Sequence, residues 1–217
     1  MSRIFESFRI GRFRGLRNAN LEDCGSTNLL VGVNNSGKSS VLEALALYCR
    51  PFDETEWLAV LRRREARSGR APRAKDLLWL FEQSDPPSIS LSSVGRHPIK
   101  NLEVTGRALS RLEPFQYKVG DDDYETDATE VSGFSISVTA TGVIPDPLGR
   151  RTLEIWDNDK IDLKGPPQEA YQRKVVTLTP YSHRLERQAL EQLSHATLEG
   201  WKGEVLDLLR RIDPAIE

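Results

Sequence analysis

The sequence predicts an α/β fold with a mixed sheet, an antiparallel β region beside it and a helical C-terminal part. The aliphatic run at residues 27–33 is typical of a strand buried on both faces, and a glycine-bounded loop joins it to residues with helical spacing. Residues 89–178 alternate apolar and polar side chains in short segments that turn residues interrupt. Residues 181–217 return to helical spacing.

Two short strands are expected before the aliphatic run. Ile4, Phe8 and Ile10 alternate with polar residues and predict the first strand, which ends at residues 11–15. Residues 18–22 predict a second strand that returns beside it. The strand at 27–33 then enters the loop, and the helix after the loop is expected to end at Pro51.

The loop at residues 32–39 matches the pattern G-x-x-x-x-G-K-[ST] without a mismatch. Gly32 and Gly37 lack a Cβ, so the backbone can approach a polyphosphate closely. The backbone N–H groups and the positive end of the helix would surround the phosphates, Lys38 would reach the β- and γ-phosphates, and Ser39 would offer a hydroxyl to Mg²⁺. The alternative is a glycine-rich turn that binds nothing. The strand and the helix that flank the loop favour phosphate binding. The candidate nucleotide-binding residues here are Gly32, Asn34, Asn35, Ser36, Gly37, Lys38, Ser39 and Ser40, and Ser39 is the candidate metal ligand.

The totals exclude several classes of protein. A net charge of −2 over 217 residues predicts no general attraction to nucleic acid, so any such contact would be local. Cys24 and Cys49 are too few for a disulfide framework and are expected to be reduced thiols. Charges interrupt the apolar residues of the amino terminus, which argues against a signal peptide, and no run is long enough to span a membrane. The sequence therefore predicts a cytoplasmic protein without membrane contact.

Residues 51–88 are expected to form a helical and basic insertion. Helical pieces at 54–61 and 77–81 flank residues 62–75, which carry seven basic residues and one acid. This stretch is either a local contact for nucleic acid or a solvated loop. The absence of aromatic residues for base stacking favours the solvated loop.

Residues 89–180 are expected to form an antiparallel β region that packs on the core at residues 1–50. The acidic stretch 121–125 would bind a cation or simply be solvated, and the lack of a regular ligand spacing favours solvation. His97, His183 and His195 have no metal-ligand spacing, so packing or surface roles are expected. The helical end is expected at 181–217.

Residues 10–16 and 30–44 resemble the amino-terminal lobe of ABC-type ATPases of the SMC, RecF and OLD (overcoming lysogenization defect) group, and most closely the OLD-like AAA ATPases. The resemblance implies a P-loop NTPase fold of ABC type, ATP and Mg²⁺ as cofactors, and a nucleotide-dependent dimerisation that switches a partner or an effector. It also implies that Arg14 lies near the bound nucleotide, whereas the residues alone allow a surface strand position equally well.

The family's Walker B and signature motifs are not found in the sequence. Residues 153–157 alternate with polar side chains and lack the second acid, so they match Walker B poorly. We therefore expect one incomplete ATPase domain that binds ATP, hydrolyses it poorly alone, and depends on a homodimer or a partner subunit for the missing motifs. Two alternatives remain open: a small phosphoryl-transfer enzyme with residues 62–73 as a lid, and a non-catalytic interaction module.

Overall fold

The computed structural model describes residues 3–65, 74–81, 85–118, 124–142, 147–158, 160–165 and 175–177, and single residues between 198 and 211. The chain separates into two compact units, Met1–Val175 and Val176–Glu217. In the second unit the described residues Leu198, Gly203, Glu204, Asp207 and Arg211 are helical. Most of the predicted helical end lies outside the described residues.

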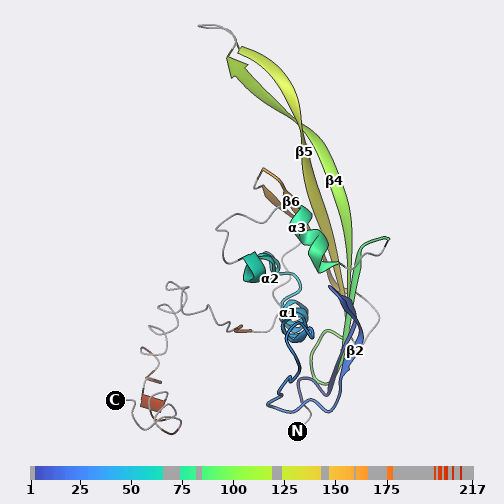
Figure 1. Ribbon diagram of the computed structural model, residues 1–217, viewed down its shortest axis with the longest axis vertical. Helices are drawn as coiled ribbons and strands as arrows, with labels where there is room; N and C mark the ends of the chain where they lie inside the picture. The colour runs from blue at the N-terminus through green and yellow to red at the C-terminus, as the bar shows by residue number, and fades with distance from the viewer. Residues whose placement is uncertain are drawn as a thin grey trace. The chain divides into compact units, whose positions relative to one another are not determined.

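The first unit is built on one seven-stranded sheet with the order β2-β1-β3-β4-β5-β6-β7 (Figure 1). Every neighbouring pair of strands in it is antiparallel. The strands are β1 (Ser7–Phe13), β2 (Leu16–Leu21), β3 (Ser88–Val94), β4 (Asn101–Lys118), β5 (Tyr124–Thr141), β6 (Pro147–Trp156) and β7 (Ile161–Lys164). The helices are α1 (Lys38–Cys49), α2 (Glu54–Glu65), the short α3 (Ala74–Leu77) and the 3₁₀ turn η1 (Leu78–Leu80).

The predicted fold class, an α/β P-loop NTPase lobe of ABC type with a mixed sheet, is wrong. The described sheet is antiparallel throughout, and residues 27–33, which were expected to be its buried parallel strand, form no strand. Leu29, Val31 and Val33 in this run are 86%, 82% and 80% exposed. A strand buried on both faces needs a hydrogen-bonded neighbour and cover on each face, and no described strand pairs with this run.

The antiparallel strands follow the period-two pattern of the sequence. The alternating segments at 89–91, 134–138 and 153–156 lie in β3, β5 and β6, which confirms them as strands. The segments at 102–104 and 115–119 were expected as separate strands, and their described residues, 102–104 and 115–118, are parts of the single long strand β4. Strand β7 was not predicted. In the segment 175–178, which was expected as a strand, the described residues 175–177 have no strand structure.

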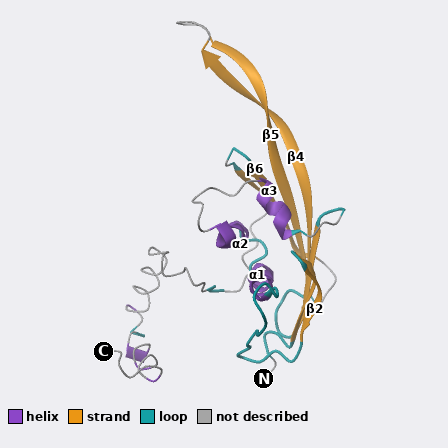
Figure 2. Ribbon diagram, in the orientation of Figure 1, coloured by secondary structure: helices purple, strands orange, loops and turns teal. Residues whose placement is uncertain are grey.

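The core lies between one face of the sheet and the helices. Phe8 and Ile10 of β1 and Leu47 and Tyr48 of α1 are almost fully buried and belong to the same cluster as Trp57 of α2. Each such side chain contributes about 1.5–3 kcal/mol through burial of apolar surface. This shared packing holds α1 against the sheet. In the ribbon diagram the helices lie on the same side of the sheet (Figure 2).

Strands β4 and β5 continue beyond the rest of the sheet. They pair over their full length, whereas β3 pairs only with residues 101–105 of β4 and β6 only with residues 133–141 of β5. Beyond these limits the described strands form a two-stranded ribbon (Figure 1).

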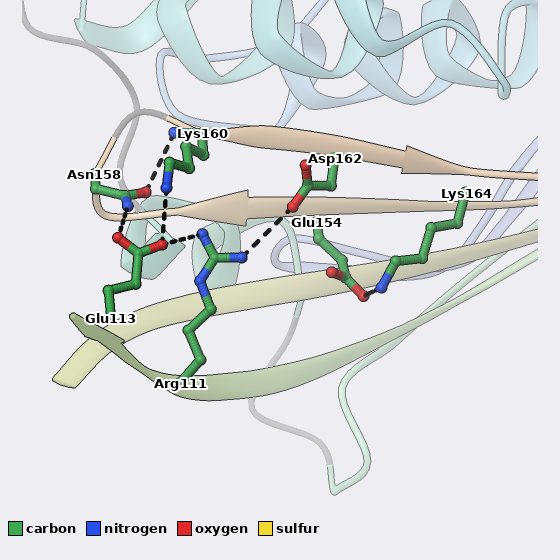
Figure 3. A network of polar contacts seen from close by, with 7 residues as sticks. All are labelled: Arg111, Glu113, Glu154, Asn158, Lys160, Asp162 and Lys164. Atoms are coloured by element: carbon green, nitrogen blue, oxygen red, sulfur yellow. Dashed lines mark hydrogen bonds and ion pairs between the residues drawn. The ribbon is translucent and has the colours of Figure 1, made fainter. Parts of the chain in front are cut away.

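A polar network joins the base of the ribbon to β6 and β7 (Figure 3). Glu113 accepts hydrogen bonds from Lys160, at 3.0 Å, and from Asn158, at 2.7 Å. The guanidinium of Arg111 pairs with Glu113 and stacks 3.8 Å above the centre of the Trp156 ring. The hydrogen bond from Lys160 is the largest cause of the lowered pKa of Glu113. These surface contacts connect the base of the ribbon to the turn between β6 and β7.

Candidate functional site

The predicted phosphate loop leads directly into α1, as the sequence indicates. Lys38 is the first residue of the helix, and its side chain folds back over the loop. Its Nζ donates hydrogen bonds of 2.7 Å to the backbone carbonyl oxygens of Gly32 and Val33, and it lies 3.5 Å from Ser36 Oγ. The ammonium group therefore lies at the mouth of the loop.

The glycines of the motif have a local steric reason. Gly37 has a φ of 88°, a left-handed conformation that other residues rarely adopt, and a Cβ there would lie 2.7 Å from Leu16 Cδ2. At Gly32 a Cβ would lie 2.8 Å from Ser36 Oγ, inside the loop. Both glycines keep the loop narrow.

The N-termini of α1 and α2 differ in how their backbone N–H groups are satisfied. At α2 the carboxylate of Asp53 accepts hydrogen bonds from the backbone N–H of Thr55, at 2.8 Å, and from its hydroxyl, and Glu54 and Glu56 lie in the first turn. At α1 the N-cap is Gly37, which makes no side-chain cap, and the first turn contains no acid. The positive end of α1 is thus left without an acidic side chain of its own.

The other predicted loop residues differ in exposure. Asn34, Asn35 and Ser36 are exposed, and Asn35 has a φ of 65°. Ser39 is exposed in the first turn of α1, whereas Ser40 is buried. The structure therefore brings the loop backbone, Lys38 and the hydroxyl of Ser39 to one accessible place.

Ser39 alone would supply only one of the oxygen ligands that Mg²⁺ requires. Mg²⁺ prefers octahedral oxygen coordination and is commonly held by one or two protein groups together with phosphates and water. Among the described residues no group of three or more His, Cys, Asp or Glu side chains could hold a metal ion. An exposed hydroxyl beside a phosphate loop fits an ion that arrives with its nucleotide, and Ser39 is the residue that would hold it.

Arg14 lies in the turn between β1 and β2 and is 9% exposed. Its Nε lies 2.8 Å from Oε2 of Glu43, which is 5% exposed on α1. Its Nη2 donates to the carbonyl oxygen of Val60 in α2 at 3.4 Å, and its backbone N–H donates to that of Leu80 at 2.9 Å. Arg14 therefore connects the first hairpin to both helices.

Glu43 is a residue that the sequence analysis did not single out. It stands among the apolar positions of α1, and an acid within an apolar helical stripe is the signal that would have pointed to a buried cationic partner. The loop and the ion pair are both attached to α1, one at its first turn and the other at its buried face.

The other residues that the sequence analysis considered either lie outside the described residues or have a packing role. Residues 66–73 of the basic stretch, residues 121–123 of the acidic stretch, His183 and His195 lie outside the described residues. His97 is 1% exposed and stacks on Phe5 with ring centres 5.2 Å apart, so it belongs to the packing. In the described part of the chain no helix is long and apolar enough to cross a membrane.

The comparisons with known proteins assign no function. A stretch of 45 residues is 49% identical to part of an uncharacterized protein of the archaeon Methanocaldococcus jannaschii. The stretch covers 21% of this chain and about a fifth, 20%, of that protein's length. No family model and no solved structure matches the chain.

Proposed function

We propose that residues 32–40 bind the polyphosphate of MgATP and that the bound nucleotide switches the association of this chain with a partner. The observation that carries the proposal is the bare N-terminus of α1, which combines an accessible loop, a lysine at the mouth of that loop and no acidic cap. Backbone N–H groups at a helix N-terminus without a side-chain cap are suited to phosphate oxygens.

The electrostatics of the loop support an anionic ligand. Lys38 donates to two neutral carbonyl oxygens of the loop, at Gly32 and Val33. Phosphate oxygens are charged acceptors and form hydrogen bonds about twice as strong as neutral ones. A polyphosphate would therefore compete well for the ammonium group while the loop backbone closes around it.

The proposal includes little hydrolysis by the chain alone. Attack by water requires a carboxylate or an equivalent group that positions it, and charge-stabilising groups around the transferred phosphate. Asp157, the last residue of the poor Walker B match, accepts a hydrogen bond of 3.0 Å from the backbone N–H of Ala74. Asp157 is thus engaged in a structural contact, and we assign the hydrolytic residues to a partner subunit or a second copy.

The exposed aliphatic run beside the loop supports a partner surface at this place. Leu29, Val31 and Val33 are each at least 80% exposed, and they precede the loop directly. An exposed cluster of large apolar side chains favours association over solvation. A nucleotide that orders the loop would also order this run. Because ATP and reduced thiols belong to the cytoplasm, we place the protein there.

The test is calorimetric titration of MgATP into the wild-type chain and into Lys38→Ala, with ATP turnover measured on the same samples. Loss of the charged contact should weaken MgATP binding about ten- to a hundredfold. Lys160→Ala is the matched control, because it removes one lysine charge at the base of the ribbon and should leave MgATP affinity unchanged.

The other outcomes would change the assignment. Rapid turnover by the chain alone would favour a self-sufficient phosphoryl-transfer enzyme. Failure of the wild-type chain to bind MgATP would leave the interaction module and refute the proposal.

A further inference from the structure

The outer face of the sheet, opposite to the helices, contains a polar groove of about 630 Å³. Strand β3 forms its floor with the small side chains of Ser88, Ser90 and Ser92. Strands β1 and β2 line one side of it and β4 the other. The polar side chains that line the two sides are Arg9, Arg12, Arg17, Asn18, Asn101 and Glu103.

A β-bulge at Gly11 brings Arg12 onto this face, beside Arg9. Ile10 pairs with Leu91 and Arg12 pairs with Ser90, so Gly11 is an extra residue between them. Without the bulge, the alternation of β1 would place Arg12 on the same buried face as Ile10. A Cβ at Gly11 would lie 2.4 Å from Ser90 Oγ, which explains a glycine at this position.

The pairing of the strands sets like charges beside each other. Arg12 and Arg17 are directly opposite in the antiparallel pair of β1 and β2. Like charges in such a position repel and destabilise a sheet. Arg9 lies on the same side of the groove, where its Nη2 is 3.5 Å from Asn18 Oδ1. Arg12 Nη1 also donates a 3.3 Å hydrogen bond to Ser88 Oγ, so a phosphate between the two guanidinium groups would add a charged acceptor to a contact already made at the floor of the groove.

A row of paired residues crosses the groove and gives it two chemically different sides. From β2 to β6 the row reads Arg17, Arg12, Ser90, Glu103, Thr139 and Arg150. Arg12 and Glu103 are separated by one strand, a backbone distance of about 9.6 Å at the usual strand spacing. The small Ser90 between them leaves space for a ligand.

We propose that this groove binds a small phosphate-bearing molecule, with its phosphate against Arg9, Arg12 and Arg17 and a ligand hydroxyl against Glu103. The guanidinium groups provide charge-assisted donors, and the serines of β3 provide hydroxyl groups at the floor. The groove volume is in the range of small-molecule sites, and no aromatic side chain lines it for base stacking.

Glu103 supports a ligand that carries a donor as well as an anion. Glu103 is exposed as a whole, but partial burial of its carboxyl group raises its pKa. A hydroxyl group that donates to this carboxylate would compensate for the lost water. The site is independent of the loop at α1, because α1 packs on the opposite face of the sheet.

The experiment is calorimetric titration of ribose 5-phosphate and inorganic phosphate into the Lys38→Ala chain. This substitution removes the lysine that is proposed to bind phosphate at the loop, so that binding at the groove is measured. Arg12→Gln in this background should weaken the binding of both probes about tenfold. Glu103→Gln should weaken ribose 5-phosphate about fivefold and leave inorganic phosphate unchanged or tighter, because it removes a negative charge. Arg150→Gln is the matched control, since Arg150 lies in the same row but outside the groove.

Thermal unfolding separates a binding role from a structural one. Without ligand, Arg12→Gln should change the melting temperature little, because Arg12 lies on the polar outer face of the sheet. At one fixed concentration, ribose 5-phosphate should raise that temperature more when Arg12 is present than when it is replaced. Equal binding of both probes by Lys38→Ala with and without Arg12→Gln, or no binding at all, would overturn the proposal. Duplex DNA that binds through Arg12 while ribose 5-phosphate does not would also overturn it, in favour of a nucleic-acid backbone.

Discussion

The two ends of α1 have opposite surroundings. Toward its C-terminus Leu47 and Tyr48 are almost fully buried, and the Tyr48 hydroxyl donates a 2.7 Å hydrogen bond to the carbonyl oxygen of Ile99. Toward its N-terminus Ser39 is exposed, and the loop before it has exposed side chains from Asn34 to Ser36. One helix is therefore both a core element and the base of an open loop.

The difference teaches how a small domain can hold an exposed loop, here the proposed phosphate loop, in a defined position. The loop makes few contacts of its own, so its position depends on the anchored part of the helix that follows it. The Arg14–Glu43 ion pair fixes that helix to the first hairpin. We call the buried part of α1, with Glu43, Leu47 and Tyr48, its anchored end, and residues 32–40 its loop end. Substitutions at the anchored end should change the stability of the protein, and substitutions at the loop end should change its ligand affinity.

The largest effect is expected at the buried ion pair. Arg14→Met leaves the carboxylate of Glu43 buried without its partner and should lower the free energy of unfolding by about 3–5 kcal/mol. Urea denaturation of the wild type and the variant measures this loss, with one common dependence of the unfolding free energy on urea concentration. The double variant Arg14→Met with Glu43→Leu should recover most of it, because neither charge of this pair then remains.

The same variant tests the contrast between the two ends. Arg14 is implied to lie near the nucleotide by the family resemblance, whereas in the structure its guanidinium faces Glu43. If Arg14→Met weakened MgATP binding and left stability unchanged, Arg14 would belong to the loop end rather than to the anchored end.

A smaller effect is expected at Tyr48. Its hydroxyl lies 2.9 Å from Ser93 Oγ and 2.7 Å from the carbonyl oxygen of Ile99. Tyr48→Phe leaves these buried groups short of a partner and should lower the free energy of unfolding at pH 7 by about 1–3 kcal/mol. MgATP affinity should not change, and a change in it would mean that the anchored end communicates with the loop.

The stability gap between wild type and Tyr48→Phe should narrow at high pH. Burial raises the pKa of Tyr48, so the folded protein holds the phenolic proton more tightly than the unfolded chain does. The wild type should therefore lose stability as the pH rises above about 10, the ordinary pKa of tyrosine, while the phenylalanine variant lacks this loss. Denaturation series at pH 7 and pH 11 measure the gap, and an unchanged gap would contradict a buried phenol.

The sequence predicted the anchored end better than the sheet around it. Helical spacing located α1, and period two located β1, β3, β5 and β6, because these patterns depend only on neighbouring residues. Residues 27–33 were assigned wrongly since an aliphatic run indicates a buried strand only if partner strands exist. That condition is a property of the whole fold and cannot be read from the run itself.

The candidate sites show the same limit. The loop residues from Gly32 to Ser40 could be proposed from the sequence because a phosphate loop has a fixed spacing, and their role stays a prediction. The groove with Arg12 and Arg17 was missed because it depends on the hairpin register and on the bulge at Gly11. Neither the register nor the bulge has a sequence pattern as specific as the loop has.

The smallest effect on stability is expected at the loop end, from Gly37→Ala. Gly37 has a φ of 88°, and alanine in this conformation should lower the free energy of unfolding by about 1–2 kcal/mol. The close atom, Leu16 Cδ2 at 2.7 Å, is the tip of a flexible side chain that can rotate away, so the clash adds little. Urea denaturation measures the change, and MgATP titration should show a further loss, because strain at residue 37 would shift the backbone N–H groups that are proposed to bind phosphate.

Gly15→Ala is the matched control for Gly37→Ala. A Cβ at Gly15 would meet no atom within 4 Å, so this substitution should change stability by less than about 0.5 kcal/mol and leave MgATP binding intact. If Gly37→Ala destabilised the protein as strongly as Arg14→Met, the loop end would be as tightly integrated as the anchored end. A modest loss of stability together with a large loss of affinity would instead separate the two ends of α1, with one end holding the helix and the other binding the ligand.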